Sequence, residues 1–153
     1  VIGNHNYLMA YAHVAHDCLL GDHVILGNGA TLGGHTHIGE YAILNAFLAV
    51  QQFVRIGAHA FLGAKAGIDR DVPPYMITAG PRAKLYGVNQ RGLKRRGFSQ
   101  ETIDVLKKAY RILWRENKRL DVGISQVERE MEMIPELKLL LDFLAGSKRG
   151  VIR

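Results

Sequence analysis

The chain has few of the features that mark a disulfide-linked or membrane-spanning protein. Of its 153 residues only one is cysteine and one is tryptophan, and no apolar run is long enough to cross a bilayer. The single cysteine, Cys18, excludes a disulfide within the chain. There is also no charged and then apolar leader of the secretory type. We therefore expect a soluble, cytoplasmic protein without stable membrane insertion.

Basic residues are scarce in one half of the chain only. Residues 1–80 hold three basic and five acidic residues, a net charge of −2, whereas residues 81–153 hold seventeen basic and nine acidic residues, a net charge of +8. Such a positive field attracts an anionic ligand or an acidic partner protein. Nucleic acid is also a polyanion, but no recognised nucleic-acid motif accompanies the charge, so we expect no nucleic-acid partner.

What the sequence does contain is a six-residue repeat. An aliphatic residue stands at every sixth position from Ile2 to Ile68, and most residues two places before it are small or β-branched, such as Ala30 and Val54. A hexapeptide repeat is typical of a parallel β-helix, in which each hexad forms one short strand and a corner, and three hexads close one triangular coil. The repeat predicts a left-handed parallel β-helix of about four coils over residues 1–75.

The repeat also predicts where side chains point. The aliphatic residue and the small residue before it face inward, because side chains alternate across a strand. Residues eighteen apart are expected to stack in columns, since three hexads make one coil. Glycines such as Gly27 and Gly57 follow the aliphatic residue, and we expect them to ease the corners. Cys18 falls on the inward register, and we interpret it as core filler.

The repeat ends at Pro73-Pro74, which cannot donate to a strand ladder. Residues 76–98 are predicted as a linker and loop region, and residues 99–153 as a C-terminal helical domain. The helix signals are an N-cap, a capping box, a proline at a first helical position and a terminal glycine: Ser99, Ser125 with Glu128, Pro135 and Gly146. The repeat shows no cap at its first coil, so we expect this chain to be the later part of a longer protein.

Seven histidines raise the possibility of a metal site or a catalytic base. His5, His23 and His59 fall at corners, where we interpret them as exposed polar residues, and we interpret His37 as another surface residue. His16 differs from these, because it points outward, precedes Asp17 and has a glycine one coil above it.

That glycine is Gly34, and its missing side chain is expected to leave a slot beside the imidazole of His16. His13 and His35 are predicted on the same flank. A neutral imidazole can take a proton from a hydroxyl, and an exposed N–H of Gly34 could stabilise an oxyanion. The group therefore suits acyl transfer onto a hydroxyl, and the alternative is a hydrogen-bonded surface cluster.

At these residues the sequence resembles the acyl-[acyl-carrier-protein]:UDP-N-acetylglucosamine O-acyltransferases, which perform the first step of lipid A biosynthesis. The similarity covers essentially the whole chain and corresponds to the C-terminal portion of the family. The matching stretches are AHVAHDC at 12–18, ATLGGH at 30–35, DVPPY at 71–75, GVN at 87–89, GLKRRGF at 92–98 and RGVIR at 149–153.

The resemblance implies transfer of a (3-hydroxy)acyl chain from acyl carrier protein to the glucosamine 3-hydroxyl of UDP-N-acetylglucosamine, with no cofactor and no metal. It implies His16 as the general base, Asp17 as its orienting partner and Gly34 as the N–H donor to the thioester oxyanion. The residues implied to bind the substrates are Met9, His13, His35, Gln52, Asn89, Arg95 and Arg96.

The resemblance further implies a homotrimer with active sites between subunits. Phe61 and Ala64 lie near the family's acyl-chain ruler, and the small Ala64 predicts a medium-to-long acyl chain. Three departures stand out: Gln51 and Arg82 each replace a frequent histidine, and the family's additional N-terminal coils are absent.

Two other functions remain open from the sequence. The chain could be a catalytically inactive module that binds the UDP-sugar or acyl carrier protein. It could also be a zinc enzyme of the γ-carbonic anhydrase kind, with His13, His16 and His35 as candidate ligands, because that class uses intersubunit histidines.

Overall fold

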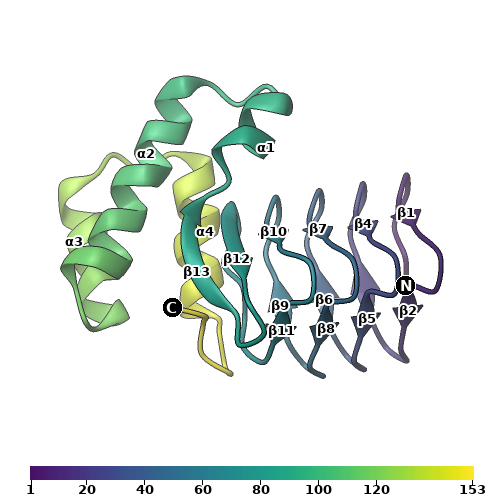
Figure 1. Ribbon diagram of the computed structural model, residues 1–153. Helices are drawn as coiled ribbons and strands as arrows, with labels where there is room; N and C mark the ends of the chain where they lie inside the picture. The colour runs from purple at the N-terminus through teal and green to yellow at the C-terminus, as the bar shows by residue number, and fades with distance from the viewer.

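The computed structural model describes all residues from Val1 to Arg153. The first half is a parallel β-helix, and the second half is a hairpin and a group of helices at the end of its last coil (Figure 1). None of the helices combines the length and the apolar character that a membrane span requires.

Two-residue strands recur every six residues and form the three walls of the β-helix. The β1 wall contains β1 (Tyr7–Leu8), β4 (Ile25–Leu26), β7 (Ile43–Leu44) and β10 (Phe61–Leu62). The β2 wall contains β2 (His13–Val14), β5 (Thr31–Leu32), β8 (Ala49–Val50) and β11 (Gly67–Ile68). The β3 wall contains β3 (Leu19–Leu20), β6 (His37–Ile38) and β9 (Arg55–Ile56). His13 pairs with Thr31, and this spacing of eighteen confirms the predicted columns.

The inward register is also confirmed. Leu32 and Val50 are 0% and 4% exposed, and Cys18 is buried in the core. The first coil is the exception, because Ile2 and Leu8 are 49% and 41% exposed where only one face of the coil is covered.

The glycines after the aliphatic residues do not form the corners, contrary to the prediction from the sequence. The left-handed backbone conformation falls two places later, on residues such as His35 (φ 59°) and Phe53 (φ 66°). At Gly27 an added Cβ would lie 2.6 Å from the backbone nitrogen of Ala46. This glycine therefore permits close stacking of consecutive coils, not the turn of a corner.

Residues 76–98, predicted as a linker and loop region, contain regular structure. Strand β12 (Met76–Ala79) continues the β1 wall by pairing in parallel with β10, and β13 (Lys84–Val88) pairs antiparallel with β12. Helix α1 (Gln90–Arg95) follows. The remaining elements are α2 (Gln100–Tyr110), the π-helix η1 (Arg111–Glu116), α3 (Leu120–Glu130) and α4 (Pro135–Ala145). One hydrophobic core of 36 buried residues continues through both halves.

The predicted helix ends were partly correct. Ser99 caps α2 by accepting a hydrogen bond from the Thr102 N–H at 3.1 Å, and Pro135 and Gly146 bound α4 as expected. The capping box at Ser125 was wrong, because α3 begins at Leu120 and Ser125 lies inside it. An added Cβ at Gly123 would come within 3.1 Å of Leu113 Cα. The glycine therefore lets the first turn of α3 pack closely against η1.

Candidate active site

The corner between the β2 wall and the β3 wall brings together four of the predicted site residues. Nδ1 of His16 lies 2.9 Å from Oδ2 of Asp17, and Nε2 of His35 lies 3.7 Å from the same oxygen. In the tautomer that donates its Nδ1–H to Asp17, Nε2 of His16 is free to accept a proton. The contact with Asp17 favours this tautomer, which is the one that a general base needs.

The charge of Asp17 is maintained by its neighbours. The hydrogen bond from His16, and then the charge of His35, hold the pKa of Asp17 below its usual value. Asp17 therefore remains a carboxylate at neutral pH and can orient His16.

Gly34 lies directly against the ring of His16. An added Cβ at residue 34 would be 2.7 Å from Cε1 and 2.8 Å from Nε2 of His16. The imidazole itself thus fills the space that the sequence predicted as an empty slot. The N–H of Gly34 donates to no group of the chain, whereas its carbonyl accepts from the Phe53 N–H at 3.0 Å. An N–H without a partner in the chain and a ring nitrogen are therefore adjacent, but Gly34 is buried beneath the ring rather than exposed as the sequence predicted.

The rings of His16 and His35 meet edge to face with centroids 5.0 Å apart, and His35 stacks on Phe53 at 4.7 Å. His13 is exposed on β2 and takes part in neither contact, while Gln52 is exposed one coil beyond Gly34. The corner therefore holds two imidazoles in contact, not three. Donor atoms of His16, Asp17 and His35 all lie within 4.8 Å of one another, which is also an arrangement that a metal ion could use.

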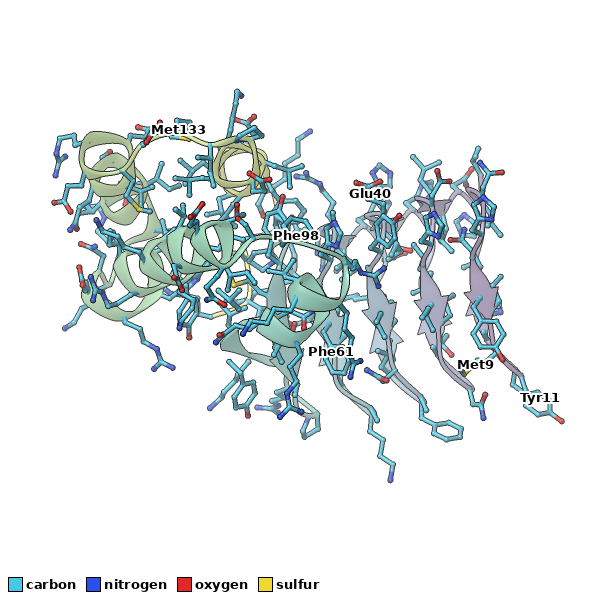
Figure 2. All side chains as sticks on the ribbon, turned by 90° about the horizontal axis from the view of Figure 1, so that it is seen from above. Met9, Tyr11, Glu40, Phe61, Phe98 and Met133 are labelled. Carbon is cyan, nitrogen blue, oxygen red and sulfur yellow. The ribbon has the colours of Figure 1, made fainter.

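Three of the predicted substrate-binding residues lie on a different side of the molecule. Asn89, Arg95 and Arg96 line a hollow of about 810 Å³ over the β1 wall, together with Phe61. Figure 2 shows Phe61 and Phe98 on this side of the last coils, far along the β-helix from Met9 and Tyr11.

The side chain of Asn89 stabilises the fold at this hollow. It is 7% exposed, its Oδ1 accepts from the Gly92 N–H at 3.2 Å, and its Nδ2 donates to the His59 carbonyl at 3.1 Å. Asn89 is therefore the N-cap of α1 and holds the helix against the β-helix.

Arg96 is held by an aromatic ring. Its guanidinium lies 4.3 Å from the ring centroid of Tyr41, and burial lowers the pKa of Arg96. Tyr41 had no predicted role, although it stands eighteen residues after His23 and eighteen before His59 in one column of rings. That spacing is the signal that could have identified it.

The prediction that His59 is an exposed turn residue was wrong. His59 is 8% exposed, and its ring stacks between Tyr41 at 5.0 Å and Tyr75 at 5.8 Å. Burial, and then the charge of Arg96, lower the pKa of His59 to about 4. The ring edge of Phe98 closes the site, so elements beyond the repeat bury this corner. His5 is exposed as expected, and His23 is half-buried.

The remaining predicted residues are spread over the surface. Met9 and Ala64 lie at the corner between the β1 and β2 walls, and Phe61 projects from β10. Gln51 accepts a hydrogen bond from Arg149 at 3.0 Å, a contact across 98 residues that sequence reasoning missed. One chain therefore does not bring its base and its arginines into one cleft.

Residues 71–152 match the family model of the UDP N-acetylglucosamine O-acyltransferases, domain 2, and residues 1–34 match the bacterial transferase hexapeptide model of six repeats. The chain belongs to the UDP-N-acetylglucosamine O-acyltransferase family. The resemblance noted in the sequence is thereby confirmed. The corner with His16 falls in the hexapeptide match, and the arginines of α1 fall in the domain 2 match.

Individual relatives show the same similarity. The chain is 51% identical over 153 residues to the acyl-[acyl-carrier-protein]–UDP-N-acetylglucosamine O-acyltransferase of Thermodesulfovibrio yellowstonii, covering 100% of this chain and 59% of that protein. The enzyme of the same description from Syntrophobacter fumaroxidans is 50% identical over 153 residues, with 99% and 59% covered. The chain thus spans about 59% of the length of these family members.

Solved family structures confirm the fold. LpxA from Acinetobacter baumannii superposes with a TM-score of 0.95 at 37% identity, covering 99% of this chain and 59% of that one. The UDP-N-acetylglucosamine acyltransferase of Arabidopsis gives a TM-score of 0.95 at 32% identity, with 99% and 56% covered.

Proposed function

We propose that this chain transfers a (3-hydroxy)acyl group from acyl carrier protein to the 3-hydroxyl of UDP-N-acetylglucosamine, the first step of lipid A biosynthesis. The observation that carries the proposal is the 2.9 Å contact of His16 with Asp17, with the free ring nitrogen over Gly34. The names of the relatives support the same reaction. We place it in the cytoplasm, with no cofactor beyond the phosphopantetheine arm of the carrier.

In the proposed mechanism, Nε2 of His16 takes the proton of the sugar hydroxyl. The oxygen then attacks the thioester carbonyl carbon, and the carbonyl oxygen becomes an oxyanion that accepts a hydrogen bond from the Gly34 N–H. Collapse of this intermediate breaks the carbon–sulfur bond, and His16 returns its proton to the leaving thiolate. Asp17 stabilises the imidazolium between the two steps.

The substrates are held by the surrounding residues in this proposal. Arg95 and Arg96 bind the nucleotide phosphates, because guanidinium groups form paired hydrogen bonds with anionic oxygens. Phe61 and Ala64 contact the acyl tail, and the small Ala64 accepts a medium-to-long chain. The residues that line the substrates in the cleft are Met9, His13, His35 and Gln52, and Asn89 lies with Arg95 and Arg96 near the hydroxyl of the acyl chain.

We infer a homotrimer, as the family resemblance implies, and the separation of these groups supports a site shared between chains. His16 lies at the corner of the β2 and β3 walls, whereas Arg95 and Arg96 lie over the β1 wall, so a neighbouring chain must complete each site. The mass of the particle in solution tests this: we expect three chains, and a monomer would contradict the shared cleft.

The reaction is tested by mass spectrometry of acylated UDP-N-acetylglucosamine formed from acyl carrier protein thioesters. We expect product from the wild type and a loss of about 10²-fold or more in rate for His16→Ala, as for removal of a general base. His5→Ala removes an exposed imidazole at another corner and should leave the rate unchanged. Binding of both substrates without product from the wild type would indicate the inactive binding module instead.

A zinc enzyme is the second candidate, because the donor atoms of His16, Asp17 and His35 lie within 4.8 Å of one another. Zinc would need its ligands at ~2.0–2.1 Å, and its binding to Nδ1 of His16 would displace the proton from that nitrogen. Metal analysis of the purified protein separates the two: one bound zinc per chain favours the zinc enzyme, and activity in the presence of chelator favours acyl transfer by His16.

A further inference from the structure

A second group of cations surrounds a hollow of about 380 Å³ beside His35, at the end of the β3 wall. We call it the Arg55 hollow. Its charged and titratable lining residues are His35, His37, Arg55, Asp71, Lys148 and Arg149. None of the arginines or lysines belongs to the residues assigned above to either substrate.

The C-terminal tail is fixed against the last coil at this hollow. Oδ1 of Asp71 accepts a hydrogen bond from the backbone N–H of Arg55 at 2.8 Å, and Oδ2 accepts one from the Ser147 hydroxyl at 2.7 Å. Asp71 also forms a parallel bridge with Val151. These contacts join segments 76 residues apart and bring Lys148 to the corner above Phe53.

The cations of the hollow have no acidic partners. Arg55, Lys148 and Arg149 form none of the ion pairs in the chain. The guanidinium of Arg55 lies over the ring of Phe143 at 4.4 Å, and Arg149 donates only to Gln51 and to a backbone carbonyl. The one carboxylate of the hollow, Asp71, already accepts two hydrogen bonds. Three cationic side chains and this carboxylate give the hollow a net charge of +2.

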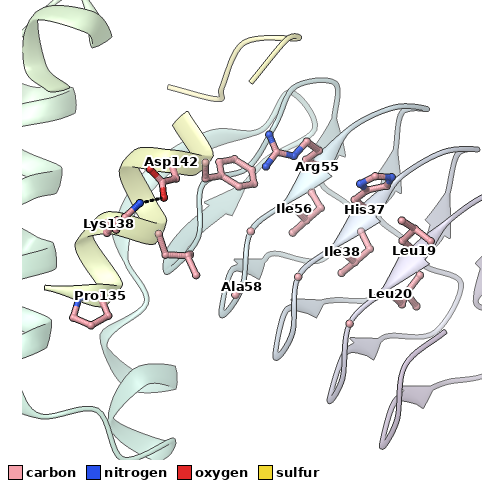
Figure 3. Close-up of a pocket in the computed structure, with 15 residues that line it drawn as sticks. Leu19, Leu20, His37, Ile38, Arg55, Ile56, Ala58, Pro135, Lys138 and Asp142 are labelled. Atoms are coloured by element: carbon pink, nitrogen blue, oxygen red, sulfur yellow. Dashed lines mark hydrogen bonds and ion pairs between the residues drawn. The ribbon is translucent and has the colours of Figure 1, made fainter. Parts of the chain in front are cut away.

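The hollow also lies on a path to the proposed catalytic corner. Figure 3 shows Arg55 and His37 projecting from neighbouring strands of the β3 wall, at the edge of a larger groove beside α4. His35 lines the hollow, and its Nε2 lies 3.7 Å from Oδ2 of Asp17. A ligand in the hollow would therefore reach the residues that orient the base.

We infer that the Arg55 hollow binds the phosphate of the phosphopantetheine arm of acyl carrier protein. The inference rests on the proposed function. Unpaired guanidinium and ammonium groups with neighbouring imidazoles are the donors that phosphate oxygens require. Because the proposed function assigns the nucleotide phosphates to Arg95 and Arg96, the phosphate bound here is the one on the carrier's arm. It is separate from the Arg95 and Arg96 site, which lies over the β1 wall.

Isothermal titration calorimetry tests the inference without turnover, with UDP-N-acetylglucosamine and 4′-phosphopantetheine as separate probes. The variant is Arg55→Gln with Lys148→Gln. The control is Arg129→Gln with Lys107→Gln, which also removes two positive charges, from the exposed surfaces of α3 and α2. Loss of a charge-assisted hydrogen bond costs about 1.5–3 kcal/mol, so we expect Kd to rise about tenfold or more for 4′-phosphopantetheine and to stay unchanged for UDP-N-acetylglucosamine. The control should bind both probes as the wild type does.

A rise in Kd for UDP-N-acetylglucosamine and not for 4′-phosphopantetheine would overturn the inference and would place the nucleotide phosphates at this hollow. Unchanged Kd values for both probes in the double variant would overturn the inference. Arg55→Gln removes the contact of the guanidinium with the ring of Phe143. Lys148→Gln is therefore also measured alone, because Lys148 is exposed and its replacement should leave the fold intact. Failure of acyl transfer in the product assay would count against the proposed function and leave these titrations valid.

Discussion

Two corners of the same β-helix, one at Asp17 and one at His59, share the same backbone φ but differ in their chemistry. Asp17 and His59 both adopt a φ of 58° at equivalent places of the repeat. The first corner is open, and its imidazoles meet a carboxylate. The second is covered by Tyr75 and Phe98, and its imidazole is buried with a pKa of about 4. The repeat thus sets the position of a side chain, whereas elements outside the repeat set its protonation.

The largest effect on the open corner is expected from Gly34→Ala. The added Cβ would collide with Cε1 and Nε2 of His16, and the ring can rotate away because it is a side chain. We expect the rate of acyl transfer to fall about 10²-fold, with little change in stability, since the base leaves its position. The rate and the melting temperature are measured on the same preparation.

Gly27→Ala is the matched control for this variant. Its Cβ would meet backbone atoms of Ala46, which cannot move aside, so the variant should lower the melting temperature. Retention of most activity in Gly34→Ala would contradict the placement of His16 against this glycine.

The covered corner is tested by His59→Phe through the pH dependence of stability. In the unfolded chain histidine titrates near 6.5, but in the fold His59 stays neutral down to about pH 4. The unfolded state therefore binds more protons between these values, and stability falls as pH falls through this window. Phe53 shows that phenylalanine tolerates the same corner conformation.

For the wild type we expect this site to lower the free energy of unfolding by about 3 kcal/mol between pH 7 and pH 4, because the pKa of His59 falls from 6.5 to about 4 on folding. His59→Phe should lose that part of the pH dependence. Urea unfolding at several pH values measures it, and identical pH profiles for both proteins would show that His59 is accessible to protons in the fold.

A smaller effect is expected from Asp17→Asn at the open corner. The amide cannot stabilise an imidazolium, so the rate should fall about tenfold, less than in a buried triad because Asp17 is exposed to water. Asp104→Asn, on the exposed face of α2, is the control for an equivalent loss of charge. A rate equal to that of wild type would remove Asp17 from the mechanism.

The contrast between the corners also shows what the sequence could predict. The spacing of eighteen placed His16 below Gly34 and Cys18 in the core, because stacking of coils is a local and repeated interaction. The burial of His59 and the contact of Arg149 with Gln51 depend on segments outside the repeat, and no period in the sequence specifies their packing. The early start of α3 was missed for the same reason.

The smallest effect tests whether the column of rings assists the site over the β1 wall. In our proposal Arg96 binds a nucleotide phosphate, and the ring of Tyr41 holds its guanidinium at 4.3 Å. Tyr41→Asn removes the ring and still tolerates the left-handed backbone, so it should raise the KM for UDP-N-acetylglucosamine without changing kcat.

A cation–π contact of about 0.5–1 kcal/mol corresponds to a rise in that KM of roughly two- to fivefold. Tyr41→Phe removes only the hydroxyl and keeps the ring face, so this variant should have the KM of the wild type. If Tyr41→Phe and Tyr41→Asn raise KM equally, the ring face does not position Arg96. If neither does, the covered corner serves the stability of the fold alone, and the two corners are functionally independent.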